Sequence, residues 1–69
     1  MTNITPLSFI DLRAMLRNLP EGAIVESRKY KIFGEWGEWK AITPERALHR
    51  LNVHTHEGYC PYDVRVMSV

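Results

Sequence analysis

A helical pattern of apolar residues covers residues 8–19. The apolar positions in this stretch are Phe9, Leu12, Met15, Leu16 and Leu19. Because they recur every three or four residues, they fall on one face of a helix. The Ser8 hydroxyl can accept a hydrogen bond from an unpaired amide of the first turn. Asp11 places a negative charge near the positive end of the helix dipole. The Pro20-Glu21-Gly22 segment then predicts the end of this first helix and a turn.

Residues 23–33 change to a pattern typical of a β-strand. One face of the strand would carry Ile24, Glu26, Arg28, Tyr30 and Ile32, and the other Val25, Ser27, Lys29, Lys31 and Phe33. The alternation of apolar and polar residues is imperfect, which predicts a bulge or bend near Ser27. Residues 34–37 begin and end with glycine and suit a hairpin loop, so we expect residues 38–42 to return as an antiparallel strand. Trp36 would then lie at the tip of the loop.

A second helix and a closing strand follow the hairpin. Thr43-Pro44-Glu45-Arg46 is a strong helix start, because threonine can cap the first amides and proline at the first helical position loses no hydrogen bond. Ala47, Leu48 and Leu51 give this helix an apolar stripe that ends near residue 52. Residues 53–62 show no regular period and predict a loop. Residues 63–69 alternate again, with one face made of Val64, Val66 and Ser68 and the other of Arg65, Met67 and Val69.

These elements predict a small single domain over residues 1–69 with the order α-β-β-α-β. The expected fold is α+β, with a three-stranded antiparallel sheet and two helices on one face, because each element must bury its apolar side. The closing strand has no polar tail and would present a pairing edge, so we expect a homodimer.

Composition narrows the class of protein. The 69 residues have a formal net charge of +1, far from the strongly basic balance of most nucleic-acid binders. Cys60 is the single cysteine, which rules out an intrachain disulfide and favours a reducing compartment. The chain shows no signal-peptide pattern and no apolar run of about 20 residues. We therefore expect a soluble, cytoplasmic protein.

The tandem Gly-Glu-Trp triplet at residues 34–39 is the strongest candidate for a contact surface. Residues three apart in a regular strand point to opposite faces, so Trp36 and Trp39 cannot both reach one core. We expect Trp39 to pack in the core or at its margin and Trp36 to contact a partner protein. The alternative is that the Trp36 indole folds back over the hairpin. Further protein contacts are expected from two arginine pairs, Arg13 with Arg17 and Arg46 with Arg50.

Nucleic-acid binding is the alternative function. The candidate phosphate contacts are Arg28, Lys29, Lys31 and Lys40, interleaved with the aromatic residues Tyr30 and Trp39. Three acidic residues in the same strands, Glu26, Glu35 and Glu38, weaken the positive field. A mixed-charge surface is therefore favoured over a track for phosphates.

Metal binding and catalysis are both disfavoured. The imidazole and thiol groups in question are those of His49, His54, His56 and Cys60. Their spacing does not provide the two ligand pairs of a structural zinc site. A nucleophilic Cys60 would need an oxyanion hole and a substrate cleft, for which the short chain offers no sign. We expect no metal, no cofactor and no enzymatic activity.

The layout of residues 24–69 resembles that of very small bacteriophage proteins that act on their hosts. The segments that carry the resemblance are the hairpin, Thr43-Pro44-Glu45-Arg46-Ala47-Leu48 and Tyr62-Asp63-Val64-Arg65-Val66. The resemblance implies a non-enzymatic protein that binds one protein of a bacterial host and alters its activity. Anti-CRISPR proteins and other host-takeover factors belong to this class.

Overall fold

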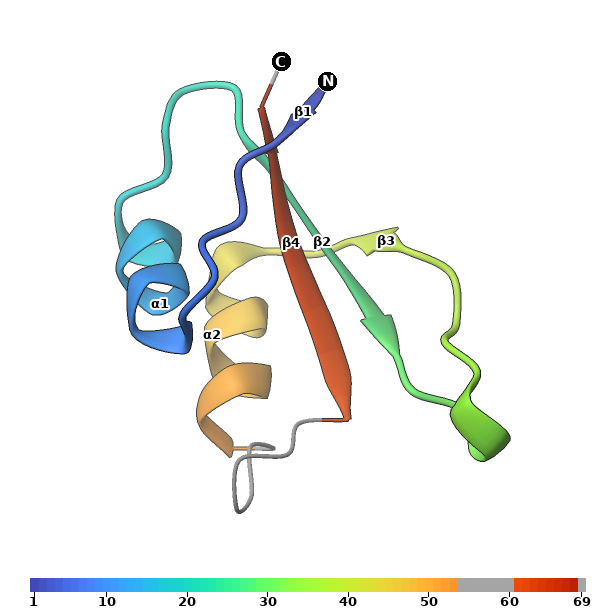
Figure 1. The fold of residues 1–69 in the computed structure, drawn as a ribbon. Helices are drawn as coiled ribbons and strands as arrows, with labels where there is room; N and C mark the ends of the chain where they lie inside the picture. Colours follow the sequence, from blue (N-terminus) through green and yellow to red (C-terminus); the bar gives the residue numbers. More distant parts are fainter. Residues whose placement is uncertain (54–60, 69) are drawn as a thin grey trace.

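Two helices and a four-stranded antiparallel sheet make up the part of the chain that the structure describes (Figure 1). The computed structural model describes residues 1–53 and 61–68. The elements in chain order are β1 (Thr2–Asn3), α1 (Phe9–Arg17), β2 (Ile24–Lys29), the 3-10 helix η1 (Ile32–Gly34), β3 (Lys40–Ala41), α2 (Pro44–Val53) and β4 (Tyr62–Ser68). The predicted α+β class is confirmed, and the sheet has one strand more than predicted. Within the described ranges, no helix is long and apolar enough to cross a membrane.

Both helices begin at the capping residues expected from the sequence. The Asp11 amide donates a hydrogen bond to Ser8 Oγ at 3.1 Å, and the Arg46 amide donates one to Thr43 Oγ1 at 3.2 Å. Each cap satisfies an amide that has no partner inside its helix, which stabilises the fold by about 1 kcal/mol. After α1 the chain turns at Gly22, whose φ of 78° lies in the left-handed region that favours glycine.

The closing strand β4 lies inside the sheet, whose strand order is β1-β4-β2-β3. It pairs with β2 along one side and with β1 along the other, where Thr2 lies opposite Ser68. The amide of Val66 also donates to Thr5 Oγ1 at 2.8 Å. The expectation that β4 presents a pairing edge is therefore wrong, because the N-terminal segment returns to cover that side. The homodimer stays a prediction.

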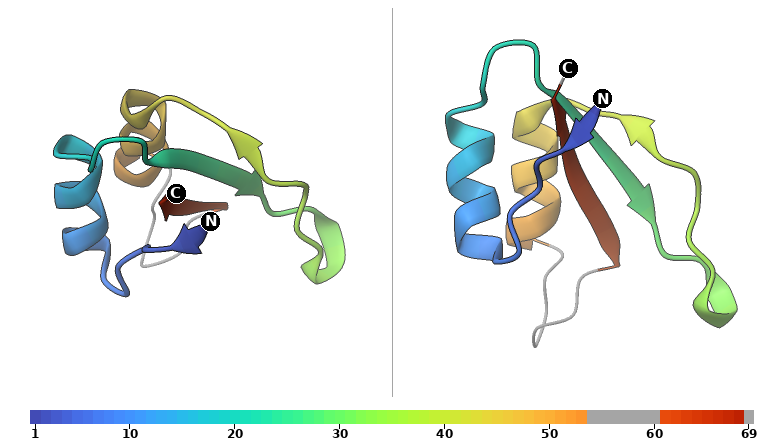
Figure 2. Two further views of the ribbon diagram at one scale, coloured as in Figure 1. Left: turned by 90° about the horizontal axis from the view of Figure 1, so that it is seen from above. Right: turned by 45° about the horizontal axis from the view of Figure 1, so that its top comes forward.

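Both helices pack on one face of the sheet and form a single core with it (Figure 2). The buried core residues are Leu12, Leu16, Val25, Ala47, Leu51, Val64 and Val66. The alternation predicted for residues 63–69 is confirmed by the buried Val64 and Val66. In β2 the predicted face of Val25 and Ser27 is buried, but the strand ends at Lys29 instead of continuing to residue 33. The other face of the sheet has no helix over it among residues 1–53 and 61–68.

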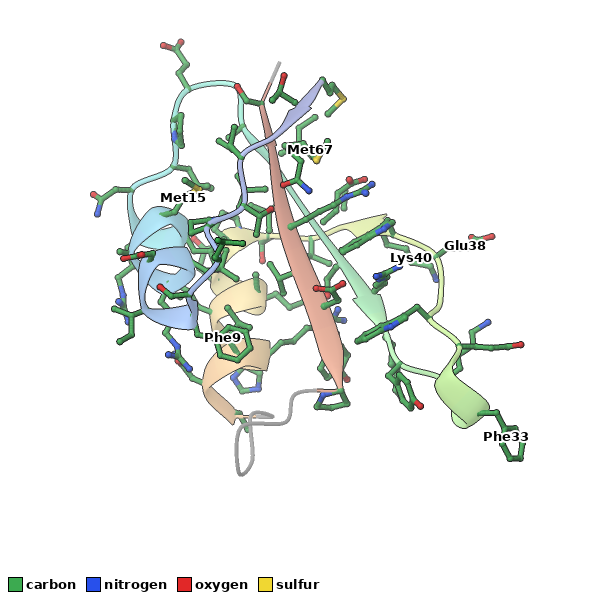
Figure 3. All side chains as sticks on the ribbon, viewed as in Figure 1. Phe9, Met15, Phe33, Glu38, Lys40 and Met67 are labelled. Atoms are coloured by element: carbon green, nitrogen blue, oxygen red, sulfur yellow. The ribbon has the colours of Figure 1, made fainter. Side chains whose placement is uncertain are left out.

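The β2–β3 hairpin extends away from the two helices and ends in η1 (Figure 1). The chain reverses direction where the Lys31 amide donates to the Glu35 carbonyl at 2.6 Å. Phe33 lies at the tip, with 97% of its surface exposed, and points away from the rest of the hairpin (Figure 3). Trp36 lies after the tip, where it forms an isolated antiparallel bridge with Tyr30. The prediction that Trp36 lies at the loop tip is therefore wrong, because the tip residue is Phe33, three positions earlier in the chain.

Candidate functional site

A β-bulge shapes the return strand of the hairpin. Tyr30 pairs with Trp36, and Ser27 pairs with Lys40, so that two residues of β2 lie opposite three residues of the return strand. The Gly37 amide donates to the Lys29 carbonyl at 2.8 Å within this bulge. The predicted bulge near Ser27 is thus on the partner strand instead. Its extra residue reverses the alternation of side chains, which brings Trp36 and Trp39 to the same face.

Arg28 connects the two tryptophans on that face. Its guanidinium carbon lies 4.8 Å from the centroid of the Trp36 ring and 4.5 Å from that of Trp39. Arg65 contacts Trp39 as well, at 4.2 Å, and Tyr30 meets Trp36 edge to face at 5.3 Å. These distances are those of cation–π and T-shaped aromatic contacts. We call the set the aromatic–arginine face; it comprises Arg28, Tyr30, Trp36, Trp39 and Arg65.

Each arginine of the aromatic–arginine face is neutralised by a carboxylate directly across the sheet. Arg28 forms an ion pair with Asp63 at 3.0 Å, and Arg65 forms one with Glu26 at 2.8 Å. The face therefore presents aromatic rings beside balanced charge. A phosphate would have to compete with these carboxylates, so the predicted role of Arg28 as a phosphate contact does not fit its surroundings.

Trp39 departs from its predicted place, whereas Trp36 combines the predicted exposure with the alternative in which its ring folds back. Trp39 is half-buried by Arg28 and Arg65, and it is not among the residues packed against the core. Its predicted place in the core or at its margin is wrong, because the bulge turns it to the other face. Trp36 keeps 39% of its surface exposed, as predicted, while its ring also folds back on Tyr30 and Arg28.

Phe33 is a candidate contact that the sequence reasoning missed. Its φ of 64° lies in the left-handed region, where a bulky residue is uncommon. A large, exposed aromatic residue in a strained conformation is typical of a recognition loop rather than of a stable turn. The available signal was the apolar pair Ile32-Phe33 directly before Gly34, where a turn usually has polar residues.

The helix-bearing side of the hairpin carries a separate, basic concavity. A pocket of about 490 Å³ lies here, and its cationic lining residues are Arg28, Lys29, Lys31, Lys40 and Arg50. A second hollow of about 390 Å³ adjoins it and is lined by Arg46, His49, Arg50 and Tyr62. Because Arg50 and Tyr62 line both, we treat the two as one basic trough. All four residues predicted for nucleic acid thus line a common space, although the Arg28 guanidinium is paired with Asp63.

The four arginines predicted as protein contacts do not gather around Trp36. Arg13 ties α1 to α2, since its Nε donates to Asn52 Oδ1 at 2.9 Å and its side chain also reaches the Leu51 carbonyl at 3.5 Å. Arg17 is exposed at the end of α1. Arg46 and Arg50 line the basic trough. The arginine that the sequence reasoning missed is Arg65, which alternates with two buried valines and so had to point away from the core.

The residues weighed for a metal site are only partly described. His49 is exposed on α2, whereas His54, His56 and Cys60 lie outside the described residues. Within residues 1–53 and 61–68, no group of three His, Cys, Asp or Glu side chains is placed to hold a metal ion.

Comparison with known proteins adds no relative from which a role could be carried over. No protein-family model, no curated protein and no solved structure matches the chain significantly.

Proposed function

We propose that the chain is a small, non-enzymatic protein-binding module that contacts its partner through the β2–β3 hairpin. The observation that carries the proposal is the exposure of two aromatic residues on this hairpin. Phe33 has 97% of its surface exposed and Trp36 has 39%. Aromatic residues of this kind are enriched among the few that dominate binding energy. Phe33 would be the inserting residue, and Trp36 would extend the contact along the aromatic–arginine face.

The contacts around Trp36 favour binding because they fix its indole before a partner arrives. Tyr30 holds one edge of the ring and Arg28 covers its face. A side chain that is already ordered loses less conformational entropy on association. Immobilising a mobile side chain costs about 0.5–1.5 kcal/mol. The balanced ion pairs beside it would form the polar rim that surrounds the apolar centre of an interface.

The resemblance of residues 24–69 to small bacteriophage proteins supplies the class of partner. The partner would be a protein of a bacterial host, met in the cytoplasm, whose activity the bound hairpin alters. Inhibition of a defence system or of another host factor fits this class.

Site-specific photo-crosslinking in a bacterial lysate tests the proposal. A photoreactive amino acid replaces Phe33, and a matched variant carries it at Ile10, which is 77% exposed on α1. We expect a discrete covalent adduct from position 33 that excess unlabelled chain suppresses, and no such adduct from position 10. An adduct from position 10 alone would place the contact on α1 and overturn the proposal, as would the absence of any suppressible adduct at position 33.

A further inference from the structure

The basic trough has no role in the proposed protein contact, and its charge is unlike that of the rest of the molecule. Lys29, Lys31 and Lys40 all line it, and none of the three makes an ion pair or side-chain hydrogen bond with another residue of the described chain. Among the described residues of the lining, Glu38 is the one acidic side chain. The formal net charge of +1 therefore hides a local excess of positive charge.

The position of the lysines follows from the strand register. Lys40 lies directly opposite Ser27, and Lys29 lies opposite Tyr62, so both point to the helix-bearing side of the sheet. None of the three lysines belongs to the core, and Arg50 of α2 lines the same space. The lysines thus face an open concavity rather than a packed interior.

Arg50 gives the trough a fixed centre. Its NH1 donates to Ser27 Oγ at 2.8 Å, and its guanidinium lies 4.3 Å from the centroid of the Tyr62 ring. Ser27 is itself 2% exposed, so the bond anchors the cation to the sheet. An arginine held in one geometry forms directed hydrogen bonds to phosphate oxygens at a lower entropic cost than a mobile one.

We propose that the basic trough binds the phosphate backbone of a single-stranded nucleic acid. The cations are distributed over two adjoining hollows, with Arg46 in the second, which suits several phosphates of one chain better than a single phosphate. Hollows of about 490 and 390 Å³ admit a flexible strand, whereas a stiff duplex would meet only their rims. Backbone contacts carry no sequence information, so binding would be independent of sequence.

Fluorescence anisotropy with a labelled oligothymidylate of about 12 nucleotides tests the site. If about four phosphates are neutralised, affinity should fall about 50-fold between roughly 50 and 200 mM salt. Lys40→Ala should weaken binding several-fold and lower the slope of log affinity against log salt by about 0.7. Arg17→Ala removes one exposed cation remote from the trough and should change affinity by less than about twofold.

Three results would overturn the proposal. Equal losses for Lys40→Ala and Arg17→Ala would show that only overall charge matters. Tighter binding of a duplex of the same length would exclude a single-strand site. Competition by poly-glutamate as effective as that of the unlabelled oligonucleotide would point to an acidic protein instead. Trp36→Ala should bind the oligonucleotide like the wild type, which keeps this test separate from that of the hairpin.

Discussion

Trp36 and Trp39 lie on the same face of the sheet, although an interval of three residues in a regular strand would place them on opposite faces. The extra residue of the bulge between them restores the common orientation, and Arg28 then lies against both rings. The hairpin is thereby stiffened on one face by aromatic and cationic contacts. On the other face the same bulge leaves Gly37 against the Lys29 carbonyl, beside the basic trough.

Substitution of Gly37 should damage the bulge. A Cβ at this position would lie 3.3 Å from the Lys29 carbonyl oxygen and 3.5 Å from Lys31 Cε, so a β-branched side chain would force the strands apart. We expect Gly37→Val to lower the free energy of unfolding by about 1–3 kcal/mol. Glu38→Val is the matched control, because its exposed side chain lies in the same bulge. Urea unfolding measures both, and equal losses would show that the close approach at Gly37 has no special effect.

Arg28→Lys should separate the ion pair from the stacking. Lysine can keep the charge opposite Asp63, but it lacks the planar guanidinium that lies against both indoles. We expect a loss of about 1 kcal/mol in the free energy of unfolding, together with a shift in tryptophan fluorescence. Arg17→Lys, on an exposed position of α1, should leave both unchanged. Wild-type stability and emission in Arg28→Lys would mean that the ion pair alone holds this face.

Phe33→Asn should stabilise the fold while it removes the contact. Asparagine tolerates the left-handed φ of 64° better than phenylalanine, and 97% exposure means that little packing is lost. We expect a gain of about 0.5–1 kcal/mol in thermal unfolding experiments. Gly34→Ala should have the opposite sign, since its φ of 82° favours glycine. A destabilised Phe33→Asn would show that the phenyl ring contributes to folding.

Truncation in the core should approach the limit of stability for so short a chain. Leu51, on α2, is 1% exposed and belongs to the core that also includes residues of α1, β2 and β4. Leu51→Ala should cost about 2–5 kcal/mol, against a total of about 3–10 kcal/mol expected for a domain of this size. Leu7→Ala removes the same atoms from a fully exposed position and should stay within about 0.5 kcal/mol of the wild type. Calorimetric melting curves would reveal the contrast, and similar midpoints would contradict the core assignment.

The parts of the fold that repeat a regular period could be predicted from the sequence. Local hydrogen bonds explain the helix caps at Ser8 and Thr43. Local spacing predicts both helices and the inward valines of β4. Strand β1 could not be found in this way. It has two residues, too few to show a period, and it is defined by its pairing with a segment more than 60 positions away.

The candidate site was harder to predict because it depends on departures from regularity. One bulge residue decided which face Trp39 would occupy, and no alternation of apolar and polar residues records such an insertion. The left-handed conformation of Phe33 is equally hidden, since glycine or asparagine is the usual residue there. The grouping of Lys29 with Arg50 depends on how α2 packs on the sheet, which is a property of the folded chain.

The most direct test of the proposed contact is the affinity of Trp36→Ala for the purified partner that is crosslinked through position 33. Isothermal titration should show a loss of about 2 kcal/mol, or about 30-fold, in a chain that still melts cooperatively. Lys40→Ala should bind this partner as tightly as the wild type, because Lys40 faces the basic trough. Unchanged affinity of Trp36→Ala, or an unfolded variant, would contradict the assignment of Trp36 as a contact residue.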